Sequence, residues 1–360
     1  MRTLAAESPS ASCLVRAMNK PQTEIREYDF SRPTATGILI CAGGFEDRAL
    51  AFVSRLRKSS CSVEAPLVLH YESQREDNEP NFERLVSRLR ALTGLDAKSI
   101  DVHADRPVRS FEEMRAKIVT AAKEVRERSA IVDVSAMTHL WALGAIHACL
   151  TAGLRTSVVY TEARWYSPLK RDARALVRAW QDENYGKAEK YLQSAALKNI
   201  HIVPQFAGNF RPGRKTCLMV FVGYEPNRIK GLVDDYAPGA LIVLYGRSPH
   251  EELRWRTKLS RDLHEDLFSR WHVREVEIST LEVSQTVAEL GQEFRVVRED
   301  YDVALAPHCS KMQALASYVF WRRHPEVQLL FTSPVRFNPE RYSRGARTTW
   351  LYDVSAAVGV

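Results

Sequence analysis

The chain has 360 residues, 45% of them hydrophobic, and a formal net charge of +7 at neutral pH. This length favours two domains of ordinary size, and the hydrophobic content excludes a globally disordered or fibrous chain. The basic balance admits acidic partners such as nucleotides, nucleic acid or anionic membrane, but 51 basic residues distributed over the whole chain do not locate a binding site.

The cysteines and the hydropathy of the chain are typical of a cytoplasmic protein. Six cysteines are scattered, without a Cys-x-x-Cys pair and without a companion histidine at zinc spacing. This is a pattern of reduced cysteines, and we expect neither a bound metal nor a cofactor. No run approaches about 18 apolar residues, and no apolar block of signal-peptide length opens the chain, so we expect no membrane partner.

Short apolar runs alternate with segments of helical spacing in the first half of the chain. The run Ile38–Ala42 suits a strand that is buried on both faces. Strands that alternate with helices in this rhythm indicate βαβ crossovers and a mainly parallel sheet. The predicted strands are 38–42, 66–71, 98–103, the run that begins at Ile131, and 155–161, and the predicted helices are 49–56, 82–89, 111–128 and a segment ending near Thr151.

The second half repeats this order at an offset of roughly 170–180 residues, which is the sequence signature of an internal repeat. Both halves also close on similar segments, Arg164-Trp-Tyr-Ser-Pro168 and Arg336-Phe-Asn-Pro339. We therefore predict two tandem Rossmann-like lobes, each a mainly parallel sheet flanked by helices. The corresponding predicted strands are 216–222, 240–245, 274–278, the run that begins at Val303, and 327–332, with a charged helix at 251–267 after the second.

Composition suggests where these parts begin and end. Residues 1–30 are predicted to be an N-terminal extension, because the first twenty are small and polar. The first lobe is assigned to 31–204, with a charged helical segment at 170–197 and one further strand near 199–203. The glycine- and proline-containing stretch 205–215 is the predicted linker, and the second lobe is 216–360.

The turn after the first strand of each half is the first candidate binding site. Ligands of open parallel sheets sit outside the carboxyl ends of the strands. A glycine there permits close backbone approach, a carboxylate can accept from a ribose hydroxyl or a base amine, and an arginine can bind phosphate. A Glu–Arg pair that caps the first helical turn is the alternative. The residues concerned are Gly44, Glu46 and Arg48, and their counterparts Gly223, Glu225 and Arg228.

The second candidate is a pair of helix starts that follow short turns of small and hydroxyl residues. Ser135 and Thr138 precede one helix, and Ser310 precedes the other. These hydroxyls can cap the helices, and together with free backbone N–H groups they can hold a phosphate at the positive end of the helix dipole. His139 adds a titratable group to the first site, and Lys311 adds a full positive charge to the second.

Asp133 stands out within an otherwise apolar strand, since a buried carboxylate is costly unless it is hydrogen-bonded. It can brace the turn that follows or act as a base, and bracing is the favoured interpretation. If the protein is an enzyme, Glu46, Asp133 and Glu225 are the candidate catalytic residues, without a metal.

The second helix start, Cys309-Ser310-Lys311-Met312 with Ala314-Leu315, resembles the CRISPR-associated Rossmann fold (CARF) domains, sensors of cyclic oligonucleotides in prokaryotic defence. Met137-Thr138-His139-Leu140 is a degenerate copy. The turn Pro307-His308-Cys309 departs from the family's Gly-rich turn, and Met312 follows Lys311 directly. Because those domains pair across a two-fold axis, the resemblance implies that the two lobes are related by a pseudo-two-fold.

The leading hypothesis is a sensor or accessory protein of antiviral defence that binds a nucleotide or a cyclic oligonucleotide. A second hypothesis is a nucleotide-cleaving enzyme that uses the same pocket, by ring-nuclease-like phosphodiester transfer or by N-glycosidic hydrolysis. A third is a scaffold for nucleic acid or for a partner defence protein. It rests on the closing segment Arg336–Arg347, in which four arginines are interleaved with aromatic residues suited to base stacking.

Overall fold

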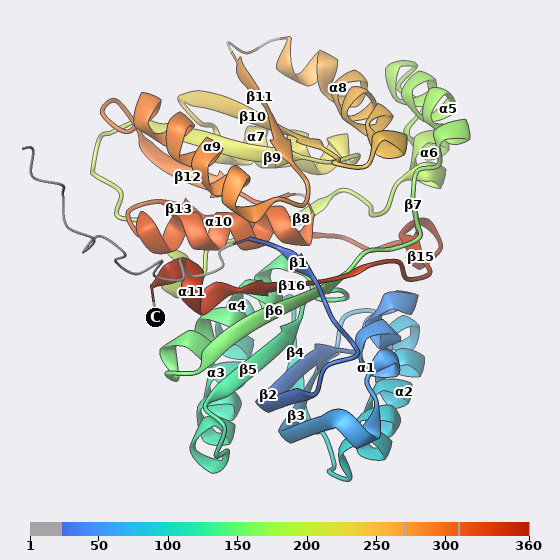
Figure 1. Ribbon diagram of the computed structural model, residues 1–360. Helices are drawn as coiled ribbons and strands as arrows, with labels where there is room; N and C mark the ends of the chain where they lie inside the picture. The colour runs from blue at the N-terminus through green and yellow to red at the C-terminus, as the bar shows by residue number, and fades with distance from the viewer. Residues whose placement is uncertain (1–23, 270, 272, 309, 360) are drawn as a thin grey trace, which may run out of the picture.

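The computed structural model describes residues 24–269, 271, 273–308 and 310–359, which form two sheets flanked by helices (Figure 1). We call the seven-stranded sheet with its helices the first lobe and the five-stranded sheet with its helices the second lobe. Parallel strands dominate both sheets. The predicted α/β class with mainly parallel sheets is therefore confirmed.

The sheet of the first lobe has the strand order β1-β16-β6-β5-β2-β3-β4. The strands from β6 to β4 are parallel, whereas β16 and β1 are antiparallel to their neighbours. Helices cover both faces, which explains why the central strands are continuous apolar runs. The strands are β1 Arg26–Glu27, β2 Thr34–Ala42, β3 Cys61–Tyr71, β4 Lys98–Val102, β5 Ser129–Asp133, β6 Arg155–Thr161 and β16 Thr349–Asp353.

The sheet of the second lobe is wholly parallel and has the order β11-β10-β9-β12-β13. Numbered by their sequence in the chain, the five parallel strands of each lobe follow the same order, 3-2-1-4-5. The same βαβ succession thus builds both sheets. The strands are β9 Thr216–Val222, β10 Ala240–Arg247, β11 Val273–Ser279, β12 Asp302–Ala306 and β13 Gln328–Leu329.

The helices form outer layers on the far faces of the sheets and a shared layer between the lobes (Figure 1). Helices α3 and α4 of the first lobe and α9 and α10 of the second contribute to one continuous hydrophobic core, in which α4 contacts α10. The two lobes therefore share buried surface. The helices are α1 Ala51–Arg55, α2 Arg75–Thr93, α3 Pro107–Glu124, α4 His139–Thr151, α7 Pro226–Tyr236, α8 Trp255–Phe268, α9 Val283–Val297, α10 Lys311–Arg323 and α11 Val354–Val358.

Each half of the chain also supplies a strand to the other lobe. After β7 (Trp165–Tyr166) the chain passes through helices α5 (Lys170–Gln181) and α6 (Tyr185–Ala188) and forms β8 (Leu197–His201). Strand β8 pairs antiparallel with β14 (Phe331–Pro334), which follows β13 of the second lobe. Strand β16 passes in the opposite direction and pairs antiparallel with β6. We call this arrangement the strand exchange.

Because of the strand exchange, the sheets do not follow the predicted boundaries. Strand β8 lies within the predicted first lobe, 31–204, but pairs in the second, whereas β16 and α11 lie within 216–360 and pack in the first. The predicted strand 327–332 is divided into β13 and β14. Most of the predicted extension 1–30 lies outside the described residues, although β1 falls at its end.

Within the part of the chain that the structure describes, no helix is both long enough and apolar enough to cross a membrane.

The predicted linker 205–215 begins in the core. Phe206 is fully buried, and its ring contacts those of Phe111 and His147 from the first lobe and of Tyr318, Trp321 and Phe331 from the second. The aromatic ring thus fixes the crossing segment where the lobes meet.

We expect Phe206→Ala to lower the free energy of unfolding by about 3–5 kcal/mol, because truncation leaves a cavity between the lobes. Val335→Ala is the control, since Val335 is 62% exposed and should change stability by no more than about 0.5 kcal/mol. Equilibrium denaturation in urea measures both. Equal stability of the two variants would show that the shared core does not depend on this ring.

Candidate functional site

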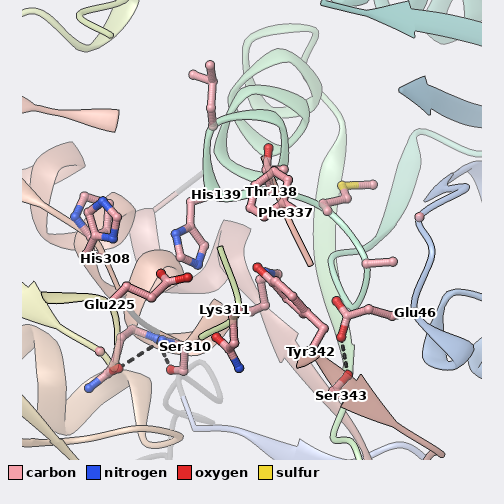
Figure 2. Close-up of a pocket in the computed structure, with 18 of the residues that line it drawn as sticks. Glu46, Thr138, His139, Glu225, His308, Ser310, Lys311, Phe337, Tyr342 and Ser343 are labelled. Carbon is pink, nitrogen blue, oxygen red and sulfur yellow. Dashed lines mark hydrogen bonds between the residues drawn. The ribbon is translucent and has the colours of Figure 1, made fainter. Parts of the chain in front are cut away.

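A cavity of about 330 Å³ lies where the two lobes meet, and both lobes line it. It contains ten of the eleven residues predicted to bind a ligand, although these come from opposite halves of the chain. Five belong to the first lobe and five are their counterparts in the second: Gly44, Glu46, Arg48, Thr138 and His139, and Gly223, Glu225, Arg228, Ser310 and Lys311. Figure 2 shows several of them around the same space.

The carboxylate of Glu46 is held by an arginine and a serine. Arg48 donates to both of its oxygens, from Nε at 2.9 Å and from Nη2 at 3.2 Å, and it also donates to the carbonyl of Thr161 at 3.4 Å. The hydroxyl of Ser343 donates to Glu46 as well (Figure 2). Glu46 and Arg48 are 6% and 4% exposed, so each charge is neutralised by a buried partner.

The second lobe contains the same arrangement. Arg228 donates to Glu225 at 2.8 Å, to the carbonyl of Thr332 at 3.4 Å and to the Thr332 hydroxyl at 3.0 Å. The hydroxyl of Ser194 donates to Glu225. Ser194 and Ser343 come from the segments that lead into β8 and β16, so each Glu–Arg pair anchors the strand that the other half supplies.

These contacts support the alternative interpretation of the Glu–Arg pairs. Both guanidinium groups already donate to carboxylate and backbone oxygens, which leaves few donors for a phosphate. The carboxylates likewise accept from buried partners. The pairs therefore form the walls of the cavity and hold the crossing segments there.

The helix start at Thr138 is open to the cavity. Thr138 is the N-cap of α4, but its side chain makes no capping hydrogen bond. Its backbone N–H donates to the hydroxyl of Tyr71 at 3.0 Å. The N–H groups of a first helical turn have no acceptor within the helix, so this end of α4 presents donors and a positive dipole to the cavity.

The helix start at Ser310 is closed by its own residues. The Ser310 hydroxyl accepts from the N–H of Gln313 at 3.1 Å and donates to the carbonyl of Thr280 at 2.6 Å. The Gln313 side chain in turn accepts from the Ser310 N–H at 3.2 Å, completing a capping box. The Ser310 hydroxyl thus stabilises α10, and Lys311 provides the positive charge at this end of the cavity.

Asp133 and Ser135 lie behind the cavity wall and do not line it. Both are buried, and Asp133 accepts from the backbone N–H of Ser135 at 3.0 Å and from its hydroxyl at 2.5 Å. The Ser135 hydroxyl accepts from the N–H of Thr161 at 2.8 Å, which ties the ends of β5 and β6 together. This is the bracing role that was favoured for Asp133, and its position gives it no access to a ligand in the cavity.

Further lining residues have no clear signal in the sequence. Tyr342 lies between Glu46 and Glu225 in Figure 2, and burial together with both carboxylates raises the pKa of its hydroxyl, so it stays a neutral donor. His308 hydrogen-bonds Thr332, and burial followed by the charge of Arg228 keeps its pKa well below the usual value. Its imidazole is therefore neutral near pH 7. Tyr166 and Phe337 also line the cavity. In the sequence, they were indicated only as members of the similar segments that close the two halves, in which each stands two residues before a proline.

A small cluster of possible metal ligands lies apart from this cavity. Ligand atoms of His70, Glu72 and Asp101 lie within 4.8 Å of one another. However, His70 is already paired with Asp101 at 3.3 Å and with Glu79 at 3.1 Å, and Arg75 pairs with Glu72 and Glu79. These ion pairs account for the cluster without a metal.

Comparison with known proteins finds no matching family model and no matching curated protein. One solved structure that matches is a type III CRISPR defence DNA nuclease activated by cyclic oligoadenylate, with a TM-score of 0.44 and 10% identity over 79% of this chain and 63% of that chain. This chain thus spans less than two thirds of that nuclease.

Two other solved structures that match are an epimerase and a galactosyltransferase. A UDP-GlcNAc 2-epimerase from Neisseria meningitidis has a TM-score of 0.20 and 13% identity, over 75% of this chain and 77% of that chain. The lipopolysaccharide outer core galactosyltransferase WaaB has a TM-score of 0.23 and 10% identity, over 82% and 92%. Similarities this weak identify no common activity.

The buried carboxyl group of Asp133 yields a testable pH dependence. Burial raises its pKa from 3.8 to about 6, against the lowering effect of the Ser135 hydrogen bonds and the Arg48 charge. A raised folded-state pKa means that its stabilising contribution is complete below about pH 4 and is lost as the pH rises through 6. At 1.36 kcal/mol per pH unit, the loss is about 3 kcal/mol.

We therefore expect wild type to lose about 2 kcal/mol relative to Asp133→Asn between pH 4 and pH 7, since part of the total has already been lost at pH 4. Urea denaturation of both proteins at several pH values measures the difference, and groups common to both cancel. A difference independent of pH would show that Asp133 is ionised throughout this range.

Proposed function

We propose that this protein binds one nucleotide-type ligand in the cavity between its lobes and acts as a sensor or accessory component of prokaryotic antiviral defence. The observation that carries the binding proposal is the convergence of two helix amino ends, α4 and α10, on one cavity. Backbone N–H groups and the dipole of such ends favour an anionic group. The defence role rests on the sequence resemblance at Ser310–Leu315.

The ligand contacts divide between an anionic part and an aromatic part. The open end of α4, with His139, and the Lys311 charge are assigned to phosphate groups, because they supply N–H donors and positive charge. Tyr71, Tyr342 and Phe337 provide hydroxyl and aromatic surfaces in the same cavity, which suits bases or ribose.

The symmetry of the cavity favours a ligand with two like halves. We call two groups of residues the Glu–Arg–Ser anchors: Glu46, Arg48 and Ser343, and Glu225, Arg228 and Ser194. The glutamates and arginines of both anchors line the cavity, and each lobe supplies one helix start. We propose a pseudo-two-fold relation between the lobes on this basis. A cyclic oligonucleotide presents phosphates on opposite sides, so one molecule can reach both helix ends.

No observation favours nucleotide cleavage over binding. Glu46 and Glu225 are each held by an arginine and a serine, and Asp133 does not line the cavity. A general base must be free to accept a proton from a substrate within hydrogen-bond reach, whereas the carboxylates of Glu46 and Glu225 line the cavity but already accept from an arginine and a serine. Product analysis of each ligand mixture after incubation would detect turnover.

We expect cyclic oligonucleotides to raise the melting temperature of the full chain more than mononucleotides do. A ligand present at 100 times its Kd adds about 2.7 kcal/mol to the stability of the folded state. Differential scanning fluorimetry identifies the binder, and isothermal titration calorimetry should then give one ligand per chain. Absence of a shift with every nucleotide tested would overturn the proposal.

With that ligand, we expect His139→Ala and Lys311→Ala each to weaken binding about tenfold or more, because each removes a polar contact to the same molecule. The control is Lys230→Ala, an exposed lysine on α7 that does not line the cavity. Unchanged affinity in both cavity variants would place the ligand elsewhere. A loss in only one variant would contradict a ligand that spans both helix ends.

A further inference from the structure

A helical insertion distinguishes the two crossing segments. In the first half, residues 167–193 separate β7 from Ser194 and contain α5 and α6, whereas in the second half only residues 338–342 separate Phe337 from β15 (Ser343–Arg344). The apolar side of α5 packs on α8, where Leu176 and Ala179 contact the cluster around Leu259 and Leu263. The insertion thus adds a surface to one side of the molecule (Figure 1).

The outward side of α5 is basic and lacks counter-charges. The helix carries four basic residues and one acidic residue. Lys170, Arg174 and Arg178 are exposed, and none forms an ion pair with a described carboxylate. Their four-residue spacing places them on one side of the helix, about 6 Å apart along its axis. Asp172 lies 3.9 Å from Arg171 and is only 24% exposed.

Helix α3 differs from α5 because neighbouring carboxylates pair with both of its arginines. On α3, Arg109 pairs with Glu113 at 2.8 Å and Arg115 with Glu112 at 2.9 Å. On α5, Arg174 has no carboxylate three or four residues away, and Arg178 forms no ion pair with a described carboxylate although Asp182 lies four residues beyond it. The basic side of α5 is therefore a local concentration of positive charge and not the general charge of the chain.

An exposed tryptophan lies at the base of this helix. Strands β7 and β15 pair antiparallel, with Trp165 opposite Arg344 and Tyr166 opposite Ser343. Tyr166 and Ser343 line the cavity, so Trp165 and Arg344 occupy the other face of this two-stranded ribbon. Trp165 is 61% exposed, and Arg344 and Arg164 are exposed without a described ion pair.

We propose that the outer face of the β7–β15 ribbon and the basic side of α5 form a binding surface for single-stranded nucleic acid. The guanidinium groups bind phosphates, and an unpaired base stacks on Trp165, with Arg164 and Arg344 beside it. This inference is independent of the cavity ligand, because none of its residues lines the cavity.

The structure argues against an anionic membrane as the partner of this basic surface. A helix that lies in a membrane interface inserts its apolar side between lipids. The apolar side of α5 is buried against α8, with Leu176 fully buried, and only its charged side is exposed. Trp165 alone offers too little apolar surface to anchor the protein.

The test uses the full chain and fluorescein-labelled single-stranded DNA and RNA of about 20 nucleotides, followed by fluorescence anisotropy at several salt concentrations. We expect Arg164→Ala/Arg174→Ala/Arg178→Ala to weaken binding at least tenfold and to reduce the log–log salt slope, by about one for each phosphate that the variant no longer neutralises. Trp165→Ala should weaken binding about tenfold with an unchanged salt slope.

The matched control is Arg109→Ala/Arg115→Ala/Lys117→Ala on α3, which removes the same charge elsewhere and should bind as wild type. His139→Ala, a cavity variant, should also bind as wild type, which separates this proposal from the proposed ligand site. Three results would overturn it: no binding of single strands, equal losses in the α3 control, or binding to phosphatidylserine vesicles without binding to oligonucleotides.

Discussion

The two Glu–Arg–Ser anchors are the contacts on which the arrangement of the lobes depends. Each joins three parts of the chain at one buried point: the turn after a first strand, a residue at the end of β6 or in β14, and a segment from the other half of the chain. A buried ion pair is stable only when its remaining hydrogen-bonding capacity is used. The serines use part of that capacity by donating to the two carboxylates, and in doing so they attach the crossing segments to the wall of the cavity.

The anchors also explain how so polar a cavity can exist at an interface that is otherwise apolar. The shared core around α4 and α10 supplies the stabilising burial, and it places the amino ends of both helices at its border. Charged side chains near those ends are neutralised within each lobe. The amino end of α4, the side chain of Lys311 and a set of aromatic rings line what remains of the cavity.

Local patterns in the sequence were sufficient for much of this fold. Continuous apolar runs such as Ile38–Ala42 predict strands covered on both faces, and both sheets contain them. The repeated order of elements predicted matched βαβ successions, and the common strand order agrees with it. The predicted boundary at 205–215 assumes that each strand pairs within its own half, whereas β8 pairs with β14. Pairing of β8 with β14 depends on contacts between residues more than a hundred positions apart, for which a single sequence carries no local signal.

The same distinction applies to the candidate site. Glu46, Arg48 and their counterparts were recognisable because a glycine turn after a strand is a local pattern. Ser194 and Ser343 could not be recognised in the sequence, because the role of each serine depends on its hydrogen bond to a glutamate from the other half of the chain. Gln313 shows a second limit of prediction from the sequence. Its capping box with Ser310 uses a hydroxyl that the sequence alone suggested for a phosphate.

The strand exchange has a consequence for biosynthesis. Strand β16 fills a position between β1 and β6, so the first sheet is incomplete until residue 353 has been translated. A nascent chain that has emerged only as far as the second half holds an unpaired edge on β6 and lacks Ser343 beside Glu46. The first lobe therefore cannot be completed before the second half of the chain has been synthesised, so the two lobes are expected to mature together and not one after the other.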